Sequence, residues 1–247
     1  MVRERLIDFA AGGGSGLMAD GATHPVDTIR TRLWMQGGKN AGYRYNGLWH
    51  GFCDIVKKEG VRSLYKGFGS VALLTPVAHG LYFGSYEWAK KALSEKTECS
   101  ESGGHLIAGF FANGVGAFIW NPMDVVKQKQ QAMVGQLYTG PLDGLRAVWM
   151  EGGLSRGLLR GYCSGMATYG PFSAIYFGIY EQWKKICAGY AGSVDSLHTG
   201  HYVAGGTIAG TVAAAATSPI DLIKTRIQVD NSYTGIASTA ARICREE

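Results

Sequence analysis

Three short stretches of the chain combine a proline, an acid and basic residues in the same order. They read HPVDTIRTR, NPMDVVKQK and SPIDLIKTR, and their prolines Pro25, Pro122 and Pro219 lie 97 residues apart both times. In each stretch an acid follows the proline by two residues and a base follows it by five. An acid and a base three residues apart lie on the same face of a helix. The chemistry that these residues predict is therefore ionic pairing at three equivalent places.

The acids and bases could also pair between helices. They are Asp27 and Arg30, Asp124 and Lys127, and Asp221 and Lys224. If the prolines kink three helices around one axis, each acid can reach the base of the next helix. Such a ring could close one end of a water-filled pore and open again when its ion pairs break. The simpler alternative is a static ring of paired charges at helix ends.

The charged stretches follow apolar segments that are long enough to be membrane helices. Runs without Asp, Glu, Lys or Arg cover 67–86, 102–123, 161–180 and 196–220, and a fifth run, 9–26, is interrupted by Asp20 alone. About 20 residues cross a bilayer. The sequence therefore predicts five transmembrane helices.

The average composition conceals this segmentation. The chain is 46% hydrophobic and 17% charged, with 37 glycines and a mean hydropathy of −0.01. A soluble all-α protein with long core helices is the alternative. Small residues four apart, such as Gly206 and Gly210, favour the close helix contacts of membrane proteins.

The fixed period also defines the domain organisation. A unit of about a hundred residues exceeds the roughly 20 to 50 residues of a solenoid repeat. We therefore expect one domain made of the repeats 1–97, 98–194 and 195–247, the third of them incomplete.

No pattern in the sequence indicates an enzyme. The five cysteines form no CxxC pair, and no metalloprotease spacing, nucleophile elbow, Walker loop or dinucleotide-binding motif is present. We expect no cofactor. The net charge of +5 would suit nucleic acid, but the basic residues cluster between the apolar runs, as helix ends at an anionic lipid surface do. Nucleic acid is therefore not an expected partner.

The motifs resemble those of the mitochondrial carriers, whose repeats read Px[DE]xx[KR]x[KR] and then [DE]Gx4[aromatic][KR]G. All three repeats carry the first half, and EGVRSLYKG, from Glu59 to Gly67, carries the second half in full. EGGLSRGLLRG, from Glu151 to Gly161, is longer and lacks the aromatic residue. The resemblance covers essentially the whole chain.

The resemblance implies a fold and a mechanism. The fold is an all-α membrane protein, a three-fold pseudo-symmetric carrier helix bundle, and this chain ends before the sixth transmembrane helix and the third cytoplasmic pair. The six charges above would be the matrix-side salt-bridge network. Gln131 and Gln228 would brace that network, whereas the first repeat has Trp34 at the same place. Glu87, Lys90, Glu181 and Lys184 would form the cytoplasmic gate. The two networks would form and break alternately around a central site.

The same resemblance places the chain in the inner mitochondrial membrane as a multi-pass protein. It implies a small solute as substrate, cardiolipin as a lipid partner and a monomer when the bundle is complete. A non-transporting scaffold of the inner membrane and a soluble helical binding module are the alternatives from other classes.

Asp20 is the first candidate for contact with the solute. It lies seven residues before Asp27, about 20° from the same direction on a helix, and so faces the same cavity two turns away. An acid at membrane depth indicates function, although it could also pair structurally with a neighbouring helix. The runs 67–86 and 161–180 hold no Lys or Arg to bind a nucleotide or a polycarboxylate. A cation or a zwitterion is therefore favoured.

His79 is the second candidate and a possible metal ligand. PVAHGLYFGSYE resembles the second helix of the mitoferrins, where a histidine is implicated in iron passage, and imidazole suits Fe²⁺. His79 lies about 80° from the direction of Glu87, so it could instead pack between helices. Ferrous iron is the first expectation for the solute.

S-adenosylmethionine, or another small cationic or zwitterionic metabolite, is the alternative solute. Asp20 and PVDTIRTRL resemble the S-adenosylmethionine carriers, as do parts of GYCSGMATYGPFS. The Arg-Glu pair of that group is replaced here by Thr168 and Tyr169.

Overall fold

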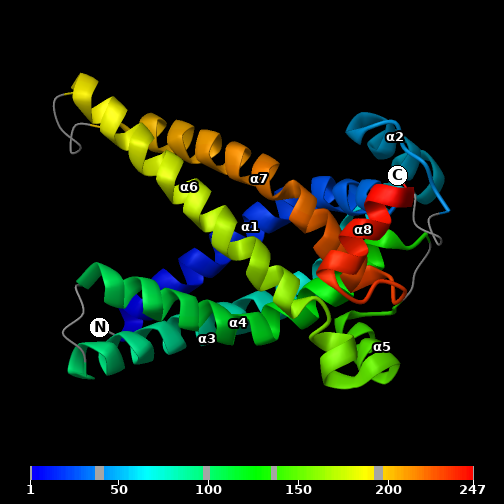
Figure 1. Ribbon diagram of the computed structural model, residues 1–247, viewed down its shortest axis with the longest axis horizontal. Coiled ribbons are helices and arrows are strands. Elements are labelled where there is room, and N and C mark those ends of the chain that lie inside the picture. Colours follow the sequence, from blue (N-terminus) through cyan, green and yellow to red (C-terminus); the bar gives the residue numbers. More distant parts are fainter. Residues whose placement is uncertain (1, 37–41, 97–100, 135–137, 192–196, 247) are drawn as a thin grey trace. The chain divides into compact units, whose positions relative to one another are not determined.

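The computed structural model describes residues 2–36, 42–96, 101–134, 138–191 and 197–246, with side chains described for all of these except 2–15, 94–96, 101–107, 191 and 246. All regular structure in these ranges is helical. The long helices are α1 (Val2–Met35), α3 (Phe68–Lys96), α4 (Glu101–Ala132), α6 (Tyr162–Ala191) and α7 (Thr199–Val229). The shorter ones are α2 (Leu48–Glu59), the 3-10 helix η1 (Val61–Tyr65), α5 (Pro141–Gly152), the π-helix η2 (Gly153–Leu158) and α8 (Ile236–Glu246) (Figure 1). The all-α prediction is confirmed.

Each of the five charge-poor runs corresponds to one long helix, as expected, although α3 and α6 begin one residue after the start of their runs and α7 begins at Thr199. Pro25, Pro122 and Pro219 lie inside α1, α4 and α7, and these three are called the proline helices below. The kinks expected at these prolines stay a prediction. By length and composition, α7 is the one described helix that is apolar enough to cross a membrane.

The residues form two compact units. The first comprises 1–162 and 225–247, and the second comprises 163–224. The proposed repeat boundaries at 97–98 and 194–195 lie outside the described residues. The last turn of α7 belongs to the first unit, together with α1 and α4.

Two small hydrophobic cores in the first unit attach the short helices to the proline helices. Ile29 of α1 packs with Tyr45, Ile55 and Leu64, and the second core of Val125, Val126, Tyr138 and Val148 joins α4 to α5. A Cβ atom on Gly51 would lie 2.9 Å from Ile29 Cγ2, and one on Gly144 would lie 2.6 Å from Val126 Cγ1. Glycine at these two positions therefore allows α2 and α5 to pack closely against α1 and α4.

Gly67 brings the loop before α3 close to the proline helix α4. It adopts a positive φ of 84°, which disfavours residues with a Cβ atom. A Cβ atom there would also lie 3.0 Å from Lys127 Cα. The loop before α3 therefore packs directly on the backbone of α4. From there α3 and α4 run side by side (Figure 1).

In the second unit α6 pairs with the first part of α7. Trp183 Nε1 donates a hydrogen bond to His201 O at 2.9 Å, and its ring packs so closely on Gly205 that a Cβ there would lie 2.4 Å away.

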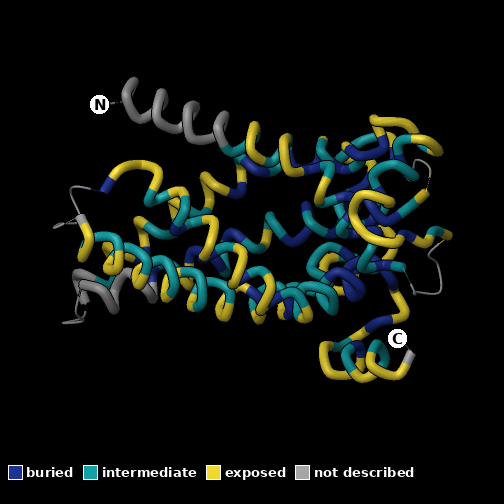
Figure 2. Tube along the Cα trace, turned by 90° about the horizontal axis from the view of Figure 1, so that it is seen from above, coloured by how far each residue is buried: buried dark blue, intermediate teal, exposed yellow. Residues whose placement is uncertain are grey.

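Apolar side chains are exposed on the long helices of both units. Phe110 is 65% exposed, and Phe83, Phe118, Phe177 and Val203 are exposed as well. Figure 2 shows exposed residues recurring along these helices. Such a surface suits a hydrocarbon environment.

Candidate functional site

An ion pair joins two proline helices in the first unit. Lys127 Nζ of α4 lies 2.8 Å from Asp27 Oδ2 of α1, and both side chains are partly buried. The acid of the first motif thus pairs with the base of the second, which is the pairing between neighbouring helices that the motif spacing allows. The contact lies between repeats and therefore holds α1 and α4 together.

The other charged residues of the motifs have different surroundings. The Arg30 guanidinium lies 4.0 Å above the ring of Trp34, so the residue in the place of a glutamine makes a cation–π contact. Asp124 lies in the first unit, whereas Asp221 and Lys224 lie in the second, and each of the three has interaction partners.

Gln131 lies one helical turn beyond Lys127 and is fully buried. Its Oε1 accepts a hydrogen bond from Thr31 Oγ1 at 3.0 Å, and its Nε2 donates to Thr28 Oγ1 at 3.2 Å. Both threonines belong to α1. The amide therefore joins α4 to α1 beside the ion pair.

The residues before the prolines hold the loops that follow the short helices. His24 Nε2 lies 2.9 Å from Lys66 O, and because a carbonyl can only accept, Nε2 carries the proton. In the second repeat Asn121 Nδ2 donates to Leu158 O at 2.8 Å. Gln228, which is also fully buried, donates from Nε2 to Asn121 Oδ1 at 3.1 Å. Gln228 thus joins the end of α7 to α4.

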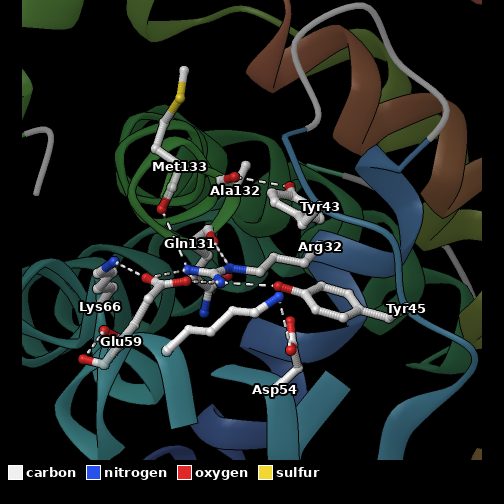
Figure 3. Close-up of polar contacts among 11 residues, drawn as sticks. Arg32, Tyr43, Tyr45, Asp54, Glu59, Lys66, Gln131, Ala132 and Met133 are labelled. Atoms are coloured by element: carbon white, nitrogen blue, oxygen red, sulfur yellow. Dashed lines mark hydrogen bonds and ion pairs between the residues drawn. The ribbon is translucent and has the colours of Figure 1, made fainter. Parts of the chain in front are cut away.

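Further charged residues surround the acids that begin the EGVRSLYKG and EGGLSRGLLRG motifs, Glu59 and Glu151. Glu59 accepts hydrogen bonds from Arg32 and Lys66 (Figure 3). Burial alone would raise the pKa of the Glu59 carboxyl, but the hydrogen bonds and charges of these two bases lower its pKa to about 2. In the second repeat Lys129 forms an ion pair with Glu151. Glu59 therefore attaches α2 to α1, and Glu151 attaches α5 to α4.

A small apolar cluster joins the C-terminal ends of the three proline helices. Met35, Ala132 and Val229 are buried together, and they are spaced by 97 residues like the prolines. We call these three residues the plug. Tyr43 Oη donates a hydrogen bond to Ala132 O at 2.8 Å, and burial raises the pKa of this phenol, which keeps it protonated as a donor. The C-terminal ends of the three proline helices therefore meet in apolar contact.

The charges expected at the opposite ends of the helices do not join helices in this way. Lys184 Nζ lies 2.6 Å from Glu181 Oε1 on the same helix, and within the described ranges Glu87 and Lys90 form no ion pair. Both Glu87 and Lys90 are exposed.

Asp20 is half-buried on α1, on the side of the ion pair that faces away from the plug. Among the residues that the structure describes, its carboxylate forms neither an ion pair nor a hydrogen bond.

His79 is exposed on α3. Its Nδ1 lies 2.9 Å from Thr75 O and so donates a hydrogen bond to this carbonyl, which leaves Nε2 as the ring nitrogen outside this bond. The ring stands edge-on to Trp120 at 5.6 Å between centroids and is stacked near Phe83 at 6.5 Å. In the described chain, no three His, Cys, Asp or Glu side chains gather where a metal could be held.

Several residues of this site were not among the sequence-based candidates. Arg32, Lys129 and the plug follow the 97-residue period, so the period was the signal that could have found them. The contacts of His24 and Asn121 with loop carbonyls carried no such signal, because the two residue types differ.

Comparison with known proteins agrees with the repeats. The family model described as "Mitochondrial carrier protein" matches residues 3–97, 100–191 and 195–247. The chain is 38% identical to "Mitochondrial substrate carrier family protein E" of Dictyostelium discoideum, over 98% of this chain and 85% of the relative. It is 36% identical to "S-adenosylmethionine carrier 1, chloroplastic/mitochondrial" of Arabidopsis thaliana, over 97% and 68%. It is 30% identical to "Mitoferrin" of Dictyostelium discoideum, over 92% and 73%. The chain belongs to the mitochondrial carrier family, whose members are membrane transporters of mitochondria.

Proposed function

We propose that this carrier moves a small cation across the inner mitochondrial membrane by alternating access. The observation that carries the proposal is the contact between the proline helices at one end, where the Asp27–Lys127 ion pair is followed by the plug at their C-terminal ends. Ion pairs in a partly buried position hold helices together but can exchange partners when the helices move. This end would be the matrix side, and the described state would be the one closed to the matrix.

The charges at the other end fit the same cycle. Glu87 and Lys90 are exposed, and Lys184 is paired within its own helix, so these groups remain available for pairing between helices. When the matrix end opens, they would pair between helices and close the cytoplasmic end. Gln131 and Gln228 would stabilise the matrix-closed state by their buried hydrogen bonds.

Asp20 supports a cationic solute. A half-buried carboxylate that lacks a basic partner among the described residues favours a positive charge nearby. It shares the helix of Asp27, two turns further from the plug, so a cation held there would lie about 10 Å along the helix from the ion pair. Binding could then weaken the Asp27–Lys127 contact and couple the solute to opening.

Ferrous iron is the first proposed solute. His79 uses only Nδ1 in its hydrogen bond to Thr75, so Nε2 is the nitrogen that would bind a metal, and imidazole nitrogen and carboxylate oxygen are both ligands of Fe²⁺. One similar protein is named a mitoferrin.

An organic cation such as S-adenosylmethionine is the second candidate. Trp120 and Phe83 present aromatic rings beside His79, and aromatic faces attract sulfonium and ammonium groups. Another similar protein is named an S-adenosylmethionine carrier.

Uptake into proteoliposomes separates the two solutes. The protein would be assayed with Fe²⁺ and with S-adenosylmethionine, beside Asp20→Asn, His79→Ala and the surface control Lys58→Gln. Iron uptake that falls in His79→Ala and not in Lys58→Gln supports iron. Uptake of S-adenosylmethionine that falls in Asp20→Asn and persists in His79→Ala supports the organic cation. If Asp20→Asn takes up both solutes as fast as the parent protein, the proposed site is wrong.

A further inference from the structure

Arg32 holds the C-terminal end of the neighbouring proline helix. Its Nε donates to Gln131 O at 2.9 Å and its Nη2 to Met133 O at 3.3 Å, both at the end of α4. Its Nη1 reaches Tyr45 Oη at 3.2 Å, and the group is also paired with Glu59. The last carbonyls of a helix lack partners within the helix and carry partial negative charge, so a guanidinium is well suited to them.

Arg226 repeats this arrangement at the end of α1. Its Nε donates to Trp34 O at 2.9 Å, its Nη2 to Gln36 O at 3.2 Å and its Nη1 lies 3.4 Å from Tyr233 Oη. The first two acceptors are again two residues apart, and the third is again a tyrosine of the same repeat. In both cases the arginine comes from one repeat and the helix end from the next.

The second repeat departs from this pattern. The residue in the place of Arg32 and Arg226 is Lys129, which is paired with Glu151. The end of α7 is held instead by Arg160, the residue in the place of Lys66. Arg160 Nε donates to Ile227 O, and its Nη2 donates to Asp230 O at 3.0 Å. It also donates to Tyr233 O at 2.7 Å and to Asn231 Oδ1.

We propose that Arg160 is a positioning residue for alternating access, which takes over in this chain the role that Lys129 cannot perform. Arg32, Arg226 and Arg160 each bind backbone carbonyls at the C-terminal end of a proline helix that belongs to another repeat. We call these three contacts the clasps. They reach from the first repeat to the second, from the third to the first and from the second to the third. This inference rests on the proposed alternating access, since opening the plug requires every clasp to release.

The arginines of the clasps differ in the partners that they keep when the ends of the proline helices separate. Arg32 keeps its carboxylate partner Glu59, which belongs to its own repeat. The hydrogen bonds of Arg160 described above all go to the third repeat, so opening exchanges all of them for water or new partners. Lysine would keep the charge but not the fork of donors that reaches two carbonyls at once. Arg160→Lys should therefore weaken the matrix-closed state without removing a charge.

The test measures how often the plug opens. Ala132→Cys places a reporter thiol in the plug, in a background where the native cysteines Cys53, Cys99, Cys163, Cys187 and Cys244 are serine. The rate of modification by a methanethiosulfonate reagent is measured on detergent-solubilised protein, with Tm and gel filtration as checks of folding. Lys58→Gln is the control, because Lys58 is an exposed surface lysine paired within α2.

Arg160→Lys should raise the labelling rate by about tenfold, as expected when the net stabilisation of one charge-assisted hydrogen bond is lost. Lys58→Gln should label at the parent rate. Adding Lys129→Arg to Arg160→Lys should lower the rate again, because the arginine then stands where Arg32 and Arg226 stand. A folded Arg160→Lys protein that labels at the parent rate would overturn the inference.

Lys127→Gln separates this inference from the proposed function. It breaks the ion pair with Asp27 and should also raise the labelling rate. If Lys127→Gln raises the rate and Arg160→Lys does not, the clasp inference alone fails. If neither variant changes the rate, the alternating closure itself is wrong. The labelling requires no solute, so an incorrect choice of solute affects neither outcome.

Discussion

Single charged residues in this carrier hold neighbouring helices and loops together. Glu59 ends α2 and receives Arg32 from α1 and Lys66 from the loop before α3. Its side chain is only 14% exposed, so these contacts are partly shielded from water. Removing the charge would leave both bases without their shared negative partner. The stability of the first unit should therefore depend on this carboxylate.

Glu59→Gln should lower Tm by roughly 4 to 8 °C, because losing about 2 kcal/mol of charged hydrogen bonding costs about 2 to 4 °C per kcal/mol in a protein of this size. Asp54→Asn is the matched control, since Asp54 pairs with the exposed Lys58 and such pairs contribute little. Thermal unfolding of the purified protein measures both. Equal losses for the two variants would contradict the role of Glu59.

The effect of Glu59→Gln on thermal stability should depend on pH. The pKa of Glu59 is lowered from 4.5 to about 2 in the folded protein. A lowered pKa contributes stability that is fully present above the unfolded value and is lost as the pH falls toward the folded value. The Tm difference between the parent and Glu59→Gln should be largest above pH 4.5 and should shrink between 4.5 and 2. A difference that stays constant over this window would exclude the linkage.

Gln131 holds α4 and α1 together by hydrogen bonds between uncharged groups. Gln131→Ala removes the partner of the buried Thr31 hydroxyl, and an unsatisfied buried polar group costs about 1 to 3 kcal/mol. Tm should fall, whereas Gln130→Ala, a change at the half-buried neighbour, should have a smaller effect. A Tm loss in Gln130→Ala as large as in Gln131→Ala would contradict the brace.

At the scale of elements, the long helices could be predicted and the short ones could not. The charge-poor runs are long enough to identify α1, α3, α4, α6 and α7 without any tertiary information. The short helices α2 and α5 depend on close contact with a proline helix, at Gly51 and Gly144, and no local pattern shows which surface a glycine will meet. The role of Arg160 was missed for a related reason, because it departs from the repeat and only its three-dimensional partners reveal it.

Gly144 tests the attachment of α5. A Cβ atom there would lie 2.6 Å from Val126 Cγ1 and 3.1 Å from Tyr138 Cδ2, so Gly144→Ala must push α5 away from α4. The expected loss is about 1 to 3 kcal/mol, as for other overpacked cores. Gly140→Ala is the control, because a Cβ atom at Gly140 has open space and the backbone there is extended. Unfolding of both variants measures the difference, and a tolerated Gly144→Ala would show that the packing yields.

At the scale of the molecule, the proline-helix ends are closed by several layers that share one period. The Asp27–Lys127 ion pair, the glutamines and the plug follow one another from the middle of these helices toward their C-terminal ends. Each layer joins neighbouring repeats, so none can open without separating the helices. The layers should therefore open together.

Cross-linking the plug tests whether transport requires this separation. Met35→Cys and Val229→Cys place two thiols within one buried cluster, and a short bifunctional thiosulfonate would join α1 to α7. If the helix ends must part in every transport cycle, the cross-linked protein should take up almost no solute, and a reductant that cleaves the link should restore uptake. Met35→Cys alone, treated in the same way, controls for modification without a link. Full uptake by the cross-linked protein would mean that the solute passes without opening this end, and the proline helices would then be a fixed support and not a gate.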